Sequence, residues 1–200
     1  MQRIPTTLIF DCFGVISTPP VSSWYQINSQ KYGFTDPALS NLLKQYDLGN
    51  VTAGDIVKHF LAYPGIRATS EQIQKEIDSL ALLNVELISK MEKLKHAGYT
   101  IALLSNGSRP LYDRLIFPSH PGLKELFNAI IISSEVHMVK PDEPIYNFTL
   151  KKIKAVAPAC VFIDDNQANI DTAIRLGMYG TTYTDVPTLM QSLHSIGIAV

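Results

Sequence analysis

Five residues of this chain could together carry out phosphoryl chemistry, and their spacing places them at the ends of predicted strands. Asp11, Ser105 and the pair Asp164 and Asp165 each close a run of apolar residues, and Lys140 lies in a short connecting segment. A carboxylate nucleophile, a hydroxyl donor, a cation and acidic metal ligands are the parts that phosphoryl transfer through an aspartyl intermediate requires. Each residue alone is a weak signal, but the set predicts one phosphate-handling, Mg²⁺-assisted site.

Short strands alternating with helices are the elements that must position these residues. Helical patterns separate several of the apolar runs, which predicts βα repeats and a buried parallel sheet. The clearest helix spans residues 84–97, where Asn84 can cap the start and Gly98 can end it. The runs expected to form strands are residues 7–10, 100–104, 129–132, 159–163 and 180–183.

A helical insertion is predicted between the first strand and this helix. Residues 19–83 contain few strand-like runs and several helix signals, including Thr69 and Gln72 as a capping box. Glycine- and proline-containing turns divide the segment into about four helices. Such an insertion would stand over the carboxyl edge of the sheet and act as a lid. We therefore expect an α/β fold with a doubly wound parallel sheet: residues 1–18 and 84–200 form the core domain, and residues 19–83 form a small helical cap domain.

The composition is that of an ordinary globular protein. The chain has 200 residues, of which 46% are hydrophobic and 18% charged, with a formal net charge of -1. Because it has no basic tract, we expect no nucleic-acid partner. It also lacks a signal-peptide pattern and an apolar run of roughly 18 residues, so we expect no membrane association and a cytoplasmic protein. Cys12 and Cys160 are interpreted as core thiols rather than as a disulfide or zinc site.

Four segments resemble the motifs of the haloacid dehalogenase-like (HAD) hydrolase superfamily. They are residues 10–16 (FDCFGVI), 104–106 (LSN), 140–146 (KPDEPIY) and 162–166 (FIDDN). The resemblance spans nearly the whole chain, and the Lys-Pro-Asp-x-Pro-x-Tyr segment is specific when it is combined with the Asp-Asp pair. It implies a Rossmann-like core with a helical cap inserted after the first motif.

The resemblance also implies a role for each polar residue around the phosphoryl group. Asp11 attacks the substrate and becomes a covalent aspartyl intermediate. Ser105 donates its hydroxyl to a phosphate oxygen, and Asn106 assists through its backbone. Lys140 neutralises the charge of Asp11 and of the transferring group. The expected partner is therefore a small phosphorylated molecule.

An acidic pair at a strand end indicates a bound cation. Asp164 and Asp165 repel each other unless a cation or protons offset their charge, and Mg²⁺ prefers such oxygen ligands. The resemblance makes Asp165 the direct ligand and gives Asp164 a role through water or in orienting Lys140. Asp11 and the backbone carbonyl of Phe13 complete the expected metal ligands.

Phe13 is the main departure from the family pattern. Most phosphatases of the superfamily carry a second Asp two residues after the nucleophile, which protonates the leaving group and later activates water. The ring of Phe13 cannot move a proton, so ester hydrolysis must be slow, rely on a good leaving group or recruit a cap residue. A second departure is His137, expected in a loop, with contact to substrate or supply of the missing proton as the alternative.

Three functions remain open on these residues. The first is a Mg²⁺-dependent phosphatase acting on a small phosphorylated metabolite. The second is a 2-haloacid dehalogenase, because those enzymes carry an aromatic residue at the position of Phe13; against it, they work without metal, and the acidic pair would repel a carboxylate substrate. The third is a non-catalytic protein that binds a phosphate ligand or a protein partner. A monomer and a homodimer are equally compatible with the sequence.

Overall fold

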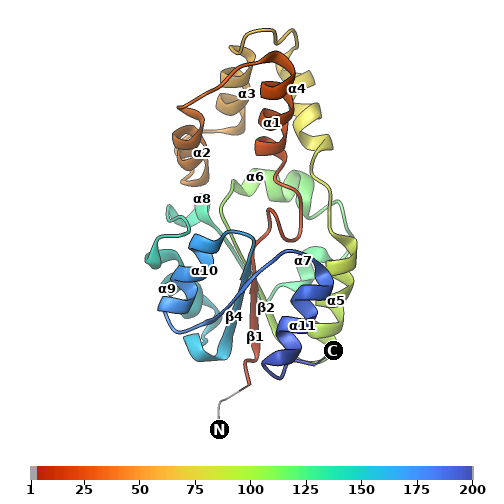
Figure 1. The fold of residues 1–200 in the computed structure, drawn as a ribbon, viewed down its shortest axis with the longest axis vertical. Helices are drawn as coiled ribbons and strands as arrows, with labels where there is room; N and C mark the ends of the chain where they lie inside the picture. The colour runs from red at the N-terminus through yellow and green to blue at the C-terminus, as the bar shows by residue number, and fades with distance from the viewer. Residues whose placement is uncertain (1–3, 200) are drawn as a thin grey trace.

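A parallel β-sheet forms the centre of the molecule. The computed structural model describes residues 4–199, and its five strands follow the order β3-β2-β1-β4-β5 with every neighbouring pair parallel (Figure 1). The five predicted strands are confirmed to within one residue at each end. They are β1 (Thr7–Phe10), β2 (Thr100–Ser105), β3 (Ala129–Ile132), β4 (Cys160–Asp164) and β5 (Tyr179–Thr182).

Helices cover both faces of the sheet, which confirms the doubly wound class. Alternate residues of each strand point to opposite faces, so Leu8 and Phe10 belong to one apolar cluster and Ile9 to the other. The first cluster is completed by α5 (Val85–His96), α7 (Leu123–Leu126) and α11 (Val186–Ser195), and the second by α9 (Glu143–Ile153) and α10 (Gln167–Arg175). The predicted cap of α5 is present, because the Asn84 side chain accepts a hydrogen bond from the Leu87 amide.

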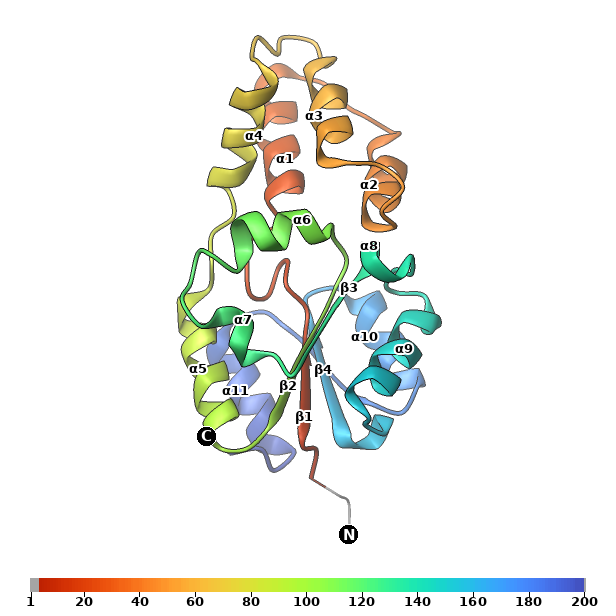
Figure 2. The same ribbon diagram turned by 180° about the vertical axis from the view of Figure 1, so that it is seen from behind.

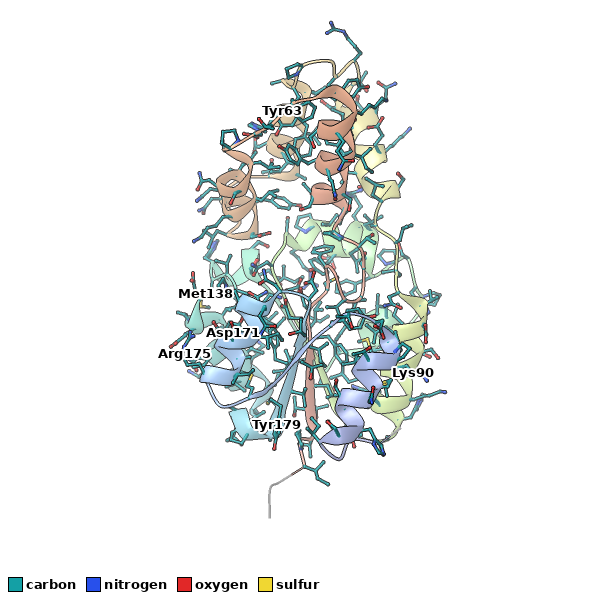
Figure 3. All side chains as sticks on the ribbon, viewed as in Figure 1. Tyr63, Lys90, Met138, Asp171, Arg175 and Tyr179 are labelled. Carbon is teal, nitrogen blue, oxygen red and sulfur yellow. The ribbon has the colours of Figure 1, made fainter. Side chains whose placement is uncertain are left out.

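A separate group of helices stands above the sheet and has its own apolar core. This helical module comprises α1 (Pro20–Tyr32), α2 (Leu39–Asp47), α3 (Ala53–Leu61) and α4 (Ser70–Ser79). Its core includes Trp24, whose ring stacks on Phe60 with centroids 4.5 Å apart. Tyr63 packs at the outer end of the module (Figure 3). The predicted capping box of Thr69 and Gln72 starts α4. The four predicted helices are therefore present, and the domain limits at 18/19 and 83/84 stay a prediction.

The carboxyl ends of the central strands face this module. The chain leaves β1 for the module, returns through α5 to β2, and later crosses to β4 on the other side of β1. This change of direction leaves a crevice at the strand ends, which is where ligands bind in such sheets. Short elements surround the crevice on the core side (Figure 2): α6 (Arg109–Leu111), η1 (Tyr112–Ile116) and α8 (Ser133–Val136). A further short helix, η2 (Ala157–Ala159), directly precedes β4.

Two further expectations can be compared with the structure. Cys12 and Cys160 are both buried and free, as predicted for core thiols. Within residues 4–199, none of the helices is both long enough and apolar enough to cross a lipid bilayer.

Candidate active site

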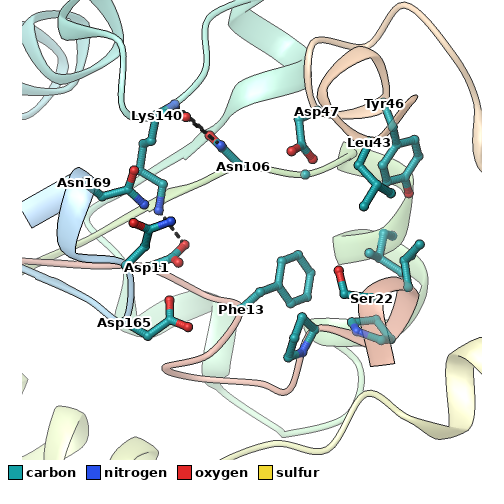
Figure 4. Close-up of a pocket in the computed structure, with 16 residues that line it drawn as sticks. Asp11, Phe13, Ser22, Leu43, Tyr46, Asp47, Asn106, Lys140, Asp165 and Asn169 are labelled. Carbon is teal, nitrogen blue, oxygen red and sulfur yellow. Dashed lines mark hydrogen bonds and ion pairs between the residues drawn. The ribbon is translucent and has the colours of Figure 1, made fainter. Parts of the chain in front are cut away.

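A buried lysine lies between two aspartates at the carboxyl edge of the sheet. The Lys140 Nζ atom is 2.8 Å from Asp11 Oδ1 (Figure 4). It is 2.6 Å from Asp164 Oδ2. Asp11 follows β1 and Asp164 ends β4, so the pairing of these neighbouring strands brings both carboxylates to the same edge. The Lys140 side chain is only 1% exposed, so water screens the two ion pairs very little. The three charges therefore form one fixed group.

The side chain of Asn106 holds the lysine backbone in place. Asn106 Oδ1 accepts a hydrogen bond from the Lys140 amide at 2.9 Å, and Asn106 Nδ2 donates to the Lys140 carbonyl at 3.0 Å. The peptide bond between Lys140 and Pro141 is cis. A backbone contribution was expected of Asn106, whereas this side-chain contact was not predicted. It connects the loop after β2 to the lysine segment.

Asn169 was also missed from the sequence, and it fixes Asp164. Its Nδ2 lies 2.9 and 3.0 Å from the two carboxylate oxygens of Asp164, and the Asn166 amide donates to Asp164 Oδ1 at 2.8 Å. Asn166 caps α10, so Asn169 stands one turn into the helix on the side that faces the strand end. An asparagine three residues after this cap is the signal that could have identified it.

The third carboxylate, Asp165, lies against a glycine that leaves no room for a side chain. A Cβ atom on Gly14 would be 2.1 Å from Asp165 Oδ2, and Gly14 has a φ of +89°, which favours glycine. Carboxylate oxygens of Asp11, Asp164 and Asp165 all lie within 4.8 Å of one another. Among residues 4–199, no backbone amide donates to the Phe13 carbonyl, so this oxygen is also available as a ligand. This set of oxygens fits a hard divalent cation.

The charge balance of the site is negative. Burial raises the pKa of Asp11 to about 6; Lys140 opposes the shift, and Asp164 adds to it. Burial alone would lower the pKa of Lys140, but Asp11 and Asp164 outweigh burial and hold that pKa above its usual value. Burial and the neighbouring Asp164 raise the pKa of Asp165. Three carboxylates thus surround one ammonium, which leaves room for a further positive charge.

Ser105 lies beside the nucleophile rather than in the open pocket. Its side chain is completely buried, and its hydroxyl donates to the Asn106 carbonyl at 3.3 Å. Ser105 is one of the groups that act to lower the pKa of Asp11, although burial outweighs them. The residues that follow it, Asn106 and Gly107, line the pocket. The role of Ser105 in binding phosphate therefore stays a prediction.

A cavity of about 310 Å³ opens between the charged group and the helical module. The Phe13 ring lies within its wall (Figure 4). Its centroid is 5.6 Å from that of Tyr112. The module side of the cavity is mostly apolar, with one carboxylate, Asp47, which the sequence analysis did not single out. The module-side lining is Pro19, Pro20, Val21, Ser22, Leu43, Tyr46 and Asp47.

His137 contacts the module through its ring. Its Nδ1 atom is 2.8 Å from the Leu48 carbonyl; because a carbonyl only accepts, Nδ1 carries the proton and donates it. His137 directly follows α8, in a connecting segment as expected.

Known proteins with similar sequences include phosphatases and dehalogenases. A sesquiterpene phosphatase from Aspergillus oryzae is 26% identical over 94% of this chain and 95% of its own length. Bifunctional epoxide hydrolase 2 from Rattus norvegicus is 27% identical over 57% of this chain, and the match spans only about a fifth (21%) of that protein. A (S)-2-haloacid dehalogenase from Pseudomonas is 23% identical over 88% of this chain and 82% of its own length.

Solved structures share the fold. A HAD family enzyme from Bacteroides thetaiotaomicron has a TM-score of 0.74 at 20% identity, covering 91% of this chain and 95% of that one. Its complex with magnesium and inorganic phosphate has a TM-score of 0.70, with 92% and 98% covered. The sequence profile of the haloacid dehalogenase-like hydrolases matches residues 5–177, which include strands β1 to β4 and the helical module. The chain therefore belongs to the haloacid dehalogenase-like hydrolase family.

Proposed function

We propose that this protein is a Mg²⁺-dependent phosphatase that hydrolyses a small phosphate monoester through an aspartyl-phosphate on Asp11. The observation that carries the proposal is the placement of Lys140 between Asp11 and Asp164, with Asp165 completing a group of carboxylates within 4.8 Å. A nucleophilic carboxylate, a fixed cation and a seat for a second cation are what phosphoryl transfer needs.

Asp11, Asp165 and the Phe13 carbonyl would hold the metal directly, with Asp164 acting through water. When bound, Mg²⁺ supplies positive charge that offsets the negative charge of the phosphoryl oxygens. The excess of carboxylates over ammonium groups at the site supports this assignment. The magnesium and phosphate complex of the Bacteroides enzyme, which shares the fold, is consistent with it.

The chain's own groups account for attack on phosphorus. Asp11 Oδ1 is held by the Cys12 amide at 2.6 Å and by Lys140, which orients the carboxylate at the strand end. Lys140 also balances charge on the transferring group. The amides around Asn106 and Gly107 and the hydroxyl of Ser105 are the proposed donors to phosphoryl oxygens. Water then attacks phosphorus and frees the Asp11 carboxylate.

The organic part of the substrate is proposed to lie toward the module. Val21 and Leu43 of the module give this side of the cavity an apolar surface, which Leu111 of α6 extends. A second, smaller cavity of about 160 Å³ adjoins it. The sesquiterpene phosphatase among the relatives is consistent with an apolar leaving group. In this proposal residues 19–83 act as a cap that excludes bulk water and selects the substrate.

Phosphate release tests the proposal. The purified protein should release phosphate from p-nitrophenyl phosphate and acetyl phosphate in the presence of Mg²⁺. EDTA should stop the release, and Asp11→Asn should reduce it by about 10³-fold or more. Equal rates for the wild type and Asp11→Asn would contradict the proposal.

Phe13 favours one alternative, a 2-haloacid dehalogenase. A halide leaves without a proton, so such an enzyme needs no acid at this position, and a dehalogenase is among the relatives. Short 2-haloacids should be assayed for halide release with and without EDTA. Metal-independent halide release that requires Asp11 would replace the phosphatase proposal.

A further inference from the structure

The proposed phosphatase has no proton donor beside its nucleophile, because Phe13 occupies that position. Transfer of phosphate from an alcohol leaves an alkoxide, which is a poor leaving group unless a proton reaches its oxygen. In an in-line displacement the leaving oxygen is on the side of phosphorus opposite Asp11. That side faces the helical module, so a donor on the module could reach the oxygen.

Asp47 is the acidic residue of the module that lines this cavity. It is the last residue of α2, and it lines both the main cavity and a neighbouring one beside Lys140. Figure 4 shows its carboxylate directed into the cavity from the side of the module, apart from the Asp11 and Lys140 group. Its side chain is half-buried and makes none of the side-chain hydrogen bonds found in residues 4–199, so it is available to a ligand.

The backbone of Asp47 is bound to the core, which keeps this residue at the edge of the cavity. The Ser133 hydroxyl donates to the Asp47 carbonyl at 2.6 Å and accepts a hydrogen bond from the Gly107 amide at 2.9 Å. His137 donates to the next carbonyl, that of Leu48. Gly49 packs so closely on α8 that a Cβ there would be 2.8 Å from the Ser134 carbonyl. This junction links Asp47 to the same loop that is proposed to bind phosphate.

The surroundings of Asp47 favour its protonated form near neutral pH. Burial raises the pKa of Asp47 to about 7; Lys140 opposes this shift, and Asp11 adds to it. A carboxyl group that titrates near the working pH can both give and take a proton. The other titratable groups on the elements packed around it are Lys44, Tyr46, Glu135, His137 and Asp142.

We propose that Asp47 is a catalytic residue that gives its proton to the leaving oxygen and later takes a proton from water. In the first step the bond from Asp11 to phosphorus forms, the bond from phosphorus to the leaving oxygen breaks, and the Asp47 proton passes to that oxygen. In the second step water attacks phosphorus, its proton returns to Asp47, and the Asp11 carboxylate is released with phosphate. This inference rests on the proposed phosphatase function.

Two aromatic leaving groups of different acidity test the proposal. The substrates are phenyl phosphate, whose leaving group needs a proton, and p-nitrophenyl phosphate, whose leaving group does not. Asp47→Asn should lower kcat/KM for phenyl phosphate by about 100-fold and leave that for p-nitrophenyl phosphate within about 5-fold. Because kcat/KM covers only the steps up to transfer onto Asp11, a slower second step does not affect this comparison.

Two further readouts separate catalysis from structure. The wild type should lose activity on phenyl phosphate as the pH rises through about 7, because Asp47 loses its proton there. The pH profile of Asp47→Asn should not show this fall in activity. The variant should also release a burst of p-nitrophenolate equal to the enzyme concentration, followed by slow turnover. Glu71→Gln, which removes an exposed carboxylate from α4, is the matched control and should behave as the wild type.

The outcomes also distinguish this inference from the proposed function. No Asp11-dependent release of p-nitrophenolate by the wild type would reject the phosphatase function itself. If the wild type is active on both substrates and Asp47→Asn loses the same fraction of kcat/KM on each, or none, only the role of Asp47 would be rejected. Activity of the wild type on p-nitrophenyl phosphate but not on phenyl phosphate would reject that role as well. Circular dichroism and thermal unfolding would verify that Asp47→Asn is folded.

Discussion

The two sides of the active-site cavity are built on different principles. The sheet edge carries buried charges that hold one another in place, with Lys140 between Asp11 and Asp164. The module side is largely apolar, and Asp47 is the acidic group that it contributes. The first side suits the phosphoryl group, which is common to all phosphate esters, whereas the second suits the part of the substrate that varies. The difference indicates that chemistry and selectivity can change separately.

Each side of the cavity belongs to a part of the molecule with its own apolar core. The sheet is packed on both faces, and its apolar clusters draw residues from distant parts of the chain. The module has its own cluster, formed around Trp24 and Phe60. The apolar clusters of the two parts are separate, and the contacts that join the parts include the Arg114–Asp78 ion pair and the Ser133–Asp47 hydrogen bond. Substitutions should therefore act on one side of the cavity with little effect on the other.

The largest effect on stability is expected at Lys140. Lys140→Met leaves Asp11 and Asp164 buried without their cation, which should cost about 3–5 kcal/mol in free energy of unfolding at pH 8. Added Mg²⁺ should restore part of this loss. Lys140 lowers the pKa of Asp11 against the effect of burial, so removing it should raise that pKa above about 6, and the loss should shrink as the pH falls toward 6 because the folded variant then binds a proton on Asp11.

Urea unfolding of Lys140→Met at several pH values measures this effect. Lys93→Met, which removes an exposed lysine from α5, is the control and should change stability little. A loss in Lys140→Met that does not depend on pH would contradict the charge-based account.

Gly14→Ala should weaken metal binding on the sheet side. The added Cβ would overlap Asp165 Oδ2 at 2.1 Å, so the carboxylate must move. We expect the Mg²⁺ concentration for half-maximal activity to rise by about 10-fold or more. Gly33→Ala in the module is a matched control, because Gly33 also has a positive φ of +69° but its Cβ would meet nothing within 4 Å. A similar rise in both variants would attribute the effect to backbone strain alone.

Val21→Trp should change selectivity on the module side. Val21 lines both adjoining cavities, so a larger side chain should raise KM for phenyl phosphate by about 10-fold while leaving acetyl phosphate nearly unchanged. Steady-state kinetics with both substrates measures the change. Ile27→Trp lies on the same helix at an exposed position (50%) and should have no such effect. An equal loss on both substrates would contradict the division of roles between the two sides.

The smallest effect is expected at the exposed ion pair between the parts. Arg114→Gln removes the partner of Asp78 and should reduce the free energy of unfolding by less than about 1 kcal/mol. The difference should diminish at high salt, since exposed charges are screened. Thermal unfolding at low and high ionic strength would detect it. A larger loss of unfolding free energy, or one that does not depend on salt, would contradict the expectation that the Arg114–Asp78 ion pair contributes little.

Local patterns in the sequence determined the sheet and the sheet-side residues. Apolar runs separated by helical patterns can form a buried parallel sheet, and residues that follow parallel strands must share one edge. This geometry is why Asp11, Asp164 and Asp165 could be predicted as a group. A local pattern also predicted α5, because Asn84 caps the start of the helix.

Only the tertiary structure decided the module side of the site and the residues that hold the charges. Asn106 became important because the fold brings its side chain to the backbone of Lys140, 34 residues away in sequence. Asn169 is only five residues from Asp164, and its role follows from the way the first turn of α10 faces the end of β4. Asp47 lies at the end of an ordinary amphipathic helix, and no local pattern marks it. Its position follows from the packing of α2 on α8, where Ser133 binds its carbonyl. Long-range packing fixes which surface residues meet a cavity, whereas strand periodicity already fixes which residues reach the edge of a sheet.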